Sequence, residues 1–372
     1  MDSETKPIKI CFIAPKAYPL FNLDVKKVFG GAEVDLYFLA TELAKDENFA
    51  VSFITADYGQ EQTETIKNVK IIKSLSFKEN PLSGAIKVWR AMRTADAQIY
   101  FQEAASWGTF LAAVFCKLHK RIFTYRTAHL RECDGTYLRG HYFTGRAFRW
   151  SLHSAAQVVV QNETDKEGLK QTMAVHSIVI PNAHHLPVLS ESRKDTVLWV
   201  GRSIEFKRPE LFIDLAEKMS DEHFTMICQR ATGDEKYEEL VGRAKQVKNL
   251  EFIERVGFDQ VENYFQRAKV FVNTSESEGF PNTFIQACKC ATPILSLNVN
   301  PDNFLNKYSC GLCCGGNLNE LTDSLAFMLE ESRYQQMGRN ARTYVEKKHD
   351  ITRIIEQYKK LFIQLVQEAN CD

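Results

Sequence analysis

Short apolar runs alternate along the chain with longer segments in which apolar residues recur at helical spacing. The run at 8–14 (IKICFIA) is apolar at nearly every position, as in a buried strand, and 32–44 (AEVDLYFLATELA) has the period of a helix. The same reading predicts further strands and helices in the first half: strands at 49–55, 69–72, 98–101, 121–125, 157–161 and 177–180, and helices at 82–93 and 105–118. Near-continuous apolar strands that alternate with helices indicate a parallel sheet covered on both faces.

The alternation restarts after a polar segment at 181–195 (PNAHHLPVLSESRKD). This segment contains two prolines and no periodicity, so we expect a linker. The second half then predicts strands at 196–200, 224–228, 250–253, 270–273 and 293–296, a helix at 209–219, and helix throughout 330–368. The chain is therefore expected to form two tandem doubly wound α/β domains, whose ligands bind beyond the carboxyl ends of the strands.

Composition excludes several classes of protein. The 372 residues include 47 basic and 47 acidic side chains, so a globally basic nucleic-acid binder is not expected. No apolar run approaches the ~20 residues of a membrane span, and the polar start predicts a cytoplasmic protein. The ten cysteines are expected to be reduced core thiols, because Cys288 and Cys290 have C-x-C spacing with no histidine nearby. Neither a G-x-G-x-x-G nor a P-loop motif is present.

Two motifs in the second half carry candidate chemistry. Gly201 ends a predicted strand, and Arg202 and Lys207 follow it before a helix. This pattern is equally consistent with a diphosphate-binding site and with a solvated basic turn. The segment 275–287 (SESEGFPNTFIQA) follows another strand and places Glu278 before a helix start. A carboxylate there can bind sugar or ribose hydroxyls, and an ordinary acidic helix cap is the alternative.

Two weaker candidates lie in the first half. Gly30 and Gly31 open a predicted helix, where paired glycines let an anion approach the backbone closely, although a plain loop is equally consistent. His129 follows the strand at 121–125 and would lie at the strand's carboxyl end. A lone histidine is more often structural, but its position favours a functional role.

In combination these motifs resemble the retaining glycosyltransferases of family 4, which have the GT-B fold of two Rossmann-like domains facing each other across a cleft. The resemblance rests on VGR with the following Lys207, on SESEGFPNTFIQA, on IVIPN at 178–182 and on FGGAE at 29–33. It implies an acceptor-binding domain at 1–183, completed by a last helix at about 352–372. It also implies a donor-binding domain at 184–351.

The resemblance further implies roles for single residues. Arg202 and Lys207 would hold the donor diphosphate without a metal, Glu278 would bind hydroxyls of the transferred sugar, and His129 would bind the sugar's 6-hydroxyl or orient the acceptor. The base would stack near Val256. The other implied donor contacts are Gly30, Gly31, Gly201, Gly279, Phe280, Pro281, Asn282, Thr283 and Gln286.

One position departs from the family pattern. Gln286 stands where the family has a second glutamate that binds the ribose, so the charge of that contact is lost. The resemblance implies transfer from a nucleotide-diphosphate sugar, UDP-linked in preference to GDP-mannose, to a glycan or lipid-linked acceptor for polysaccharide or glycoconjugate synthesis. A non-catalytic sugar-nucleotide-binding subunit and a nucleotide-sugar epimerase are the alternatives.

The acceptor half also contains a basic region rich in aromatic residues. From 117 to 149 there are eight Lys or Arg and two acids, with aromatic residues interleaved and Trp150 next. Such a region suits anionic lipid headgroups and peripheral contact with the inner face of a membrane. The alternative is a solvated face whose aromatic residues belong to the core.

Overall fold

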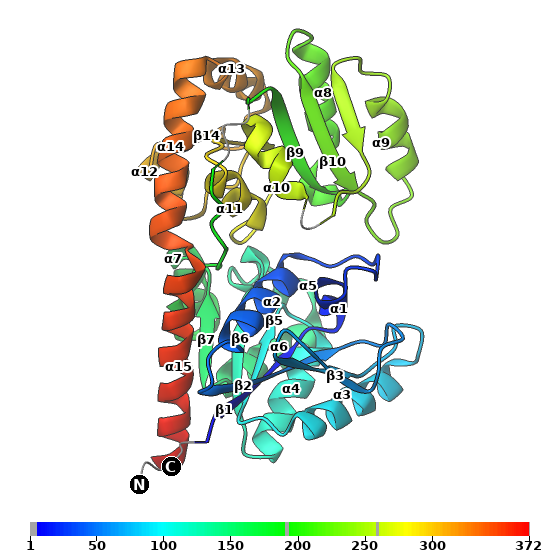
Figure 1. Cartoon of the computed structure of the whole chain (residues 1–372), viewed down its shortest axis with the longest axis vertical. Coiled ribbons are helices and arrows are strands. Elements are labelled where there is room, and N and C mark those ends of the chain that lie inside the picture. Colours follow the sequence, from blue (N-terminus) through cyan, green and yellow to red (C-terminus); the bar gives the residue numbers. More distant parts are fainter. Residues whose placement is uncertain (1–5, 190–192, 258–259, 372) are drawn as a thin grey trace. The chain divides into compact units, whose positions relative to one another are not determined.

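The chain is described by a computed structural model that covers residues 6–189, 193–257 and 260–371 (Figure 1). It divides into two compact units. Unit 1 contains the residues up to His184 together with those from Ile351 onward, and unit 2 is His185–Asp350. Each unit has its own sheet and its own hydrophobic core, and each is described separately below.

Unit 1 is built on a largely parallel sheet in the order β3-β4-β2-β1-β5-β6-β7-β8. Its strands are β1 (Ile8–Ile13), β2 (Phe49–Thr55), β3 (Thr63–Ile66), β4 (Val69–Lys73), β5 (Ile99–Glu103), β6 (Ile122–Arg126), β7 (Gln157–Val160) and β8 (Ser177–Val179). The central strands β1 and β5 are buried along most of their length, which explains why they have no polar face in the sequence. Only β3 among these strands pairs antiparallel, at the edge of the sheet.

The helices of unit 1 begin and end at recognisable signals. They are α1 (Tyr18–Phe21), α2 (Gly31–Leu43), α3 (Pro81–Ala95), α4 (Trp107–Leu118), α5 (Thr136–Gly140), α6 (Tyr142–Ser154), α7 (Glu163–Met173) and α15 (Ile351–Cys371), with 3-10 turns η1 (Pro15–Ala17) and η2 (Leu130–Glu132). The Asn80 side chain caps α3 by accepting from the amide of Ser83, and a proline occupies the first turn.

The last helix belongs to unit 1 although it lies at the end of the sequence. In α15, Tyr358 and Phe362 contact the ring of Phe101 on β5, and Lys359 forms an ion pair with Asp46. The apolar side of α15 therefore closes the core of a unit whose other elements all precede residue 185.

Unit 2 contains a parallel sheet in the order β11-β10-β9-β12-β13-β14. Its strands are β9 (Thr196–Arg202), β10 (Phe224–Gln229), β11 (Leu250–Ile253), β12 (Ala268–Asn273), β13 (Ile294–Ser296) and β14 (Gly311–Cys313). Its helices are α8 (Glu210–Lys218), α9 (Tyr237–Ala244), α10 (Val261–Arg267), α11 (Asn282–Lys289), α12 (Phe304–Lys307), α13 (Leu318–Met328) and α14 (Glu331–Lys348), with 3-10 turns η3 (Glu205–Lys207) and η4 (Pro301–Asn303). Because β9 and β12 are neighbours, the loops after them meet at one edge of the sheet.

Several expectations from the sequence need correction. The segment 330–368 is not one helix, since α14 ends at Lys348 and α15 begins at Ile351. The amphipathic period crosses this break without a signal strong enough to mark it. Strands β3 and β14 and the helices between β6 and β8 were not anticipated.

All ten cysteines are free thiols, and eight of them are buried. Among the described residues, no group of three or more His, Cys, Asp or Glu side chains is arranged to hold a metal ion.

Candidate functional site

The clearest constellation of polar side chains lies in unit 2, at the carboxyl ends of β9 and β12. The Lys207 Nζ lies 2.9 Å from Oε1 of Glu278, and only 16% and 13% of these two side chains is exposed. The same Oε1 accepts from the Ser275 hydroxyl at 2.7 Å and from the Asn273 amide at 3.4 Å. This pair is therefore held in place by the last residue of β12 and by the loop that follows it.

Arg202 is the last residue of β9, at the same sheet edge, and is half-buried. Within the described parts of the chain its guanidinium has no hydrogen-bond or ion-pair partner. A half-buried guanidinium without a protein acceptor retains its five donors for an anionic ligand. Lys207 likewise has three donors, of which the pair with Glu278 uses one.

The segment 279–283 places backbone amides beside this pair. Gly279 is buried, Pro281 caps α11 and the helix begins at Asn282, with the Phe284 amide bonded to the Pro281 carbonyl at 2.9 Å. The Phe280 side chain is packed in the core against the rings of Phe304 and His349. Only the backbone of Phe280 is thus suited to contact a ligand.

The other residues expected to contact the donor differ in their exposure to solvent. Thr283 and Gln286 are half-buried on α11, and within the described residues the Gln286 amide makes no hydrogen bond. Val256 is half-buried and packs against the hydrophobic core of unit 2 that contains Phe284. The next residue, Gly257, is exposed.

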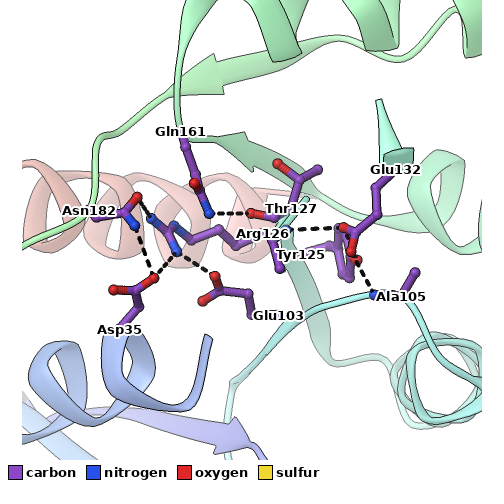
Figure 2. Close-up of polar contacts among 10 residues, drawn as sticks. Asp35, Glu103, Ala105, Tyr125, Arg126, Thr127, Glu132, Gln161 and Asn182 are labelled. Atoms are coloured by element: carbon purple, nitrogen blue, oxygen red, sulfur yellow. Dashed lines mark hydrogen bonds and ion pairs between the residues drawn. The ribbon is translucent and has the colours of Figure 1, made fainter. Parts of the chain in front are cut away.

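In unit 1, His129 begins a short loop at the end of β6. Its Nδ1 accepts from the amide of Arg131 at 3.1 Å, which leaves Nε2 as the protonated nitrogen of the neutral ring. The loop is anchored by Glu132, which accepts from the amides of Ala128 and Ala105 and from the hydroxyl of Tyr125 (Figure 2). Burial raises the pKa of Glu132 to about 7.

A second buried cluster in unit 1 is centred on Arg126, the last residue of β6 (Figure 2). The guanidinium bonds Glu103 at 2.6 Å, Asp35 at 3.3 Å and the Asn182 side chain at 2.7 Å. Burial raises the pKa of Glu103 well above its usual range, partly offset by the charge of Arg126. This cluster ties the end of the sheet to α2 and to the chain just before unit 2.

Sequence reasoning missed this cluster. A signal was available, because Arg126 and Glu103 are charged residues at the ends of two otherwise apolar strands that lie next to each other. This signal did not identify the whole cluster, because Asp35 and Asn182 are distant in the sequence. No pattern near Arg126 or Glu103 shows that these two residues are partners.

The paired glycines are placed differently from the expectation. Gly30 has an extended backbone and donates its amide to the Glu33 carboxylate at 2.7 Å, within a capping arrangement at the start of α2. The Gly30 amide is therefore already bonded, and the carboxylate puts negative charge where an anion was expected.

The basic aromatic region is only partly a surface. Phe123, Tyr125 and Phe148 are core residues, and Arg126 is buried in its ion pairs, so these members of the region cannot meet a lipid. On α6, by contrast, Tyr142 and Phe143 are exposed. Among the described residues, no helix has the length and apolar character needed to cross a membrane.

Two family models match successive parts of the chain. The model for Glycosyltransferase Family 4 matches residues 29–186, and the model for Glycosyl transferases group 1 matches residues 184–344. Uncharacterized glycosyltransferases from Methanocaldococcus jannaschii and Haemophilus influenzae are 24% and 25% identical to the chain over 217 and 218 residues. These matches cover 56% and 55% of this chain and only about three-fifths of the curated relatives, 59% and 60%.

Solved structures share the architecture. A sucrose-phosphate synthase from Thermosynechococcus elongatus is similar with a TM-score of 0.78 at 17% identity, covering 98% of this chain and 100% of that one. A glycosyltransferase from Rickettsia africae gives 0.68 at 14% identity, with coverage of 97% and 99%. Two parallel α/β units of this kind define the GT-B fold. The chain belongs to the group 1 glycosyltransferases of family 4.

Proposed function

We propose that the protein is a retaining glycosyltransferase that moves a sugar from a nucleotide-diphosphate sugar to a glycan or lipid-linked acceptor. One observation carries the proposal. Lys207 pairs with Glu278 in the loops after β9 and β12, two adjacent strands, and Arg202, which has no partner among the described residues, ends β9 at the same sheet edge. Two cations suit a diphosphate, and the fixed carboxylate suits sugar hydroxyls. A UDP-sugar is the favoured donor, and GDP-mannose is the alternative.

The proposed chemistry needs no protein nucleophile. The bond between the anomeric carbon and the diphosphate oxygen breaks while the acceptor oxygen bonds to the same face of the sugar. The departing diphosphate takes the acceptor proton. Arg202 and Lys207 would stabilise the charge that develops on the leaving group, a role in which fixed cations are effective because they need no reorganisation.

Further contacts are assigned as part of this proposal. The backbones of Gly201 and of residues 279–283 would approach the donor, Gln286 the ribose and Val256 the base. In unit 1, His129 would donate its Nε2 proton to the sugar's 6-hydroxyl or orient the acceptor. The acceptor role of unit 1, residues 1–183 with the last helix, and the donor role of residues 184–351 complete the assignment.

The nucleotide site is tested with the full-length protein and a panel of UDP, GDP, ADP and NAD, each with and without EDTA. We expect one nucleoside diphosphate to raise the melting temperature, and the shift to survive EDTA. Lys207→Met should then weaken that nucleotide by at least about tenfold, since charge-assisted hydrogen bonds are worth ~1.5–3 kcal/mol. Lys248→Met, at an exposed lysine of the same unit, is the matched control.

Several outcomes would contradict the proposal. Unchanged nucleotide affinity in Lys207→Met refutes the diphosphate role of this residue. Nucleotide binding without sugar turnover would favour a binding subunit of a glycosylation complex. Conversion of the donor sugar without any acceptor would favour an epimerase.

The acceptor side includes a surface that fits an anionic membrane. On α6, Tyr142 and Phe143 are 62% and 75% exposed, and the Arg146 guanidinium lies 4.3 Å from the centre of the Tyr142 ring. Arg139 and Arg149 are also exposed, and residues 135–150 contain no acid. Exposed aromatic rings with arginines suit a lipid interface, where each cation contributes ~1 kcal/mol. We therefore assign a peripheral position at the inner face of the membrane.

Vesicle sedimentation tests this assignment. Wild-type protein should sediment with vesicles of phosphatidylcholine and phosphatidylglycerol and stay in solution with phosphatidylcholine alone. Phe143→Ser should lose most of the binding. Phe327→Ser is the matched control, because Phe327 is an exposed phenylalanine of unit 2 that lies against an arginine, Arg333, as Tyr142 beside Phe143 lies against Arg146. Equal binding by both variants would remove the lipid surface from the proposal.

A further inference from the structure

A hydrogen-bonded chain beneath the phosphate-binding candidates joins β9 to the loop that carries Lys207. The indole N–H of Trp199 donates to Thr274 Oγ1 at 3.0 Å, and the Thr274 hydroxyl donates to the carbonyl oxygen of Lys207 at 2.6 Å. Trp199 is 2% exposed and Thr274 is fully buried. All three residues lie in unit 2; Trp199 is on β9, and Thr274 directly follows the neighbouring strand β12.

The two end groups determine which group donates and which accepts in each of these hydrogen bonds. An indole nitrogen can only donate and a peptide carbonyl can only accept, so the threonine hydroxyl must accept from one and donate to the other. A hydroxyl is the smallest side-chain group that does both, and a buried one whose proton has a single acceptor is fixed in orientation. Serine can replace threonine here in hydrogen bonding, and valine cannot.

These hydrogen bonds lie where the loop after β9 meets the loop after β12. Thr274 follows β12 directly, four residues before Glu278, and Lys207 ends the 3-10 turn η3. A second bond between the loops, from the amide of Glu276 to the carbonyl of Phe206 at 2.8 Å, runs beside it. The backbone of Lys207 is therefore attached to the same loop whose carboxylate pairs with its side chain.

We infer that Thr274, with Trp199 as its hydrogen-bond donor, is a positioning residue that holds Lys207 at the depth where it meets Glu278 and the donor diphosphate. This inference rests on the proposed function, since it assigns a task to the same site. Without the hydroxyl, the Lys207 carbonyl and the indole N–H would both lack their partner. Of the two bonds between the loops, only that from the Glu276 amide to the Phe206 carbonyl would remain. The backbone of Lys207 could then shift, and its ammonium group with it.

The experiment compares Thr274→Val with Thr274→Ser in the full-length protein. The measurements are the Kd of UDP and of GDP by calorimetry, KM and kcat for the donor, and the melting temperature. Thr274→Val should raise the Kd of the bound nucleotide and the donor KM about fivefold, the effect of one hydrogen bond. Thr274→Ser, which keeps the hydroxyl, should bind the nucleotide as wild type does even though it loses a buried methyl group.

Trp199→Phe provides a second variant if Thr274→Val does not fold. It removes the indole donor and leaves the bond from Thr274 to Lys207, so we expect a smaller rise in Kd, about twofold. Neither side chain is expected to touch the nucleotide directly, so a change in the Kd of the nucleotide reports a change in the position of Lys207.

The outcomes separate this inference from the function on which it rests. If Lys207→Met weakens the nucleotide and Thr274→Val only lowers the melting temperature, Thr274 is a structural residue and the inference is wrong. Equal losses of nucleotide affinity in Thr274→Val and Thr274→Ser would also overturn it. If neither UDP nor GDP binds the wild-type protein, or Lys207→Met binds normally, the proposed function fails and the inference fails with it.

Discussion

Gly201→Ala tests how tightly the end of β9 is packed. Gly201 and Trp199 are two residues apart on one strand and so face the same side of the sheet. A Cβ at position 201 would lie 2.7 Å from Cη2 of the Trp199 ring, and 3.1 and 3.2 Å from two further ring carbons. The glycine has no positive φ, so it is required there for space and not for backbone conformation.

The cost of this substitution follows from the position of the indole. The ring is buried in the core of unit 2 and its N–H is bonded to Thr274, so it cannot swing aside. Overpacking costs ~1–3 kcal/mol, and loss of the indole hydrogen bond adds ~1 kcal/mol. For a unit the size of His185–Asp350, this lowers the melting temperature of unit 2 by about 5–12 °C.

A double-mutant cycle with Trp199→Phe isolates the contact. Phenylalanine lacks the outer ring of the indole, so Gly201→Ala should cost less than ~1 kcal/mol in that background, a coupling of more than ~1 kcal/mol. Calorimetric melting of the four proteins supplies the numbers. Gly242→Ala, where a Cβ meets nothing within 4 Å, is the control. If Gly201→Ala costs the same with and without the indole, the packing argument is refuted.

Three further predictions concern other parts of the molecule. Gln286→Glu should tighten the nucleoside diphosphate about threefold to tenfold in a calorimetric titration, because a charged acceptor strengthens bonds to ribose hydroxyls; unchanged affinity would show that residue 286 does not touch the ribose. The Glu132 carboxyl has its pKa raised from an ordinary 4.5 to about 7 in the folded state. The folded protein therefore holds a proton that the unfolded chain has lost, and wild type should lose up to ~3 kcal/mol of stability as pH rises from about 4.5 to 7. Glu132→Gln should show a flatter profile in denaturant titrations, and parallel profiles would contradict this assignment. Gly338→Ala should destabilise by ~1–3 kcal/mol, since its Cβ would meet the Ala291 carbonyl, whereas Gly242→Ala in exposed helix should stabilise by ~0.5–1 kcal/mol; melting curves that rank the two variants in the opposite order would refute the packing argument.

The strands of both sheets other than β3 and β14 could be predicted because their signal is local. The predicted strands at 49–55 and 250–253 coincide with β2 and β11 to the residue. Strand β3 (Thr63–Ile66, TETI) could not be predicted in this way. It is short and polar with no buried residue, and its pairing with β4 at the sheet edge makes it a strand.

The candidate site could also be predicted only in part from the sequence. Lys207 and Glu278 were identified from residue type and from their place after strands, and the structure brings them within 2.9 Å of each other. Gly30 and Gly31 were proposed to let an anion approach the backbone, and the structure shows the Gly30 amide bonded to Glu33. A pair of glycines indicates that a ligand could approach the backbone closely. Only the folded loop shows which group the backbone amide binds.

The sequence by itself determined the two α/β units, the places where strands end, and the charged residues that follow those ends. These properties depend on hydrophobic period and residue type within a few positions of the chain. The tertiary structure alone decided that Thr274 bonds the Lys207 carbonyl and that Arg126 joins Glu103 to Asp35 and Asn182. It also supplied the contacts of α15 with unit 1, which the family resemblance had only implied. Such contacts join residues that are far apart in the sequence, from 23 positions for Arg126 and Glu103 to more than 250 for Phe101 and Tyr358. Their energy depends on burial and geometry that exist only in the folded chain.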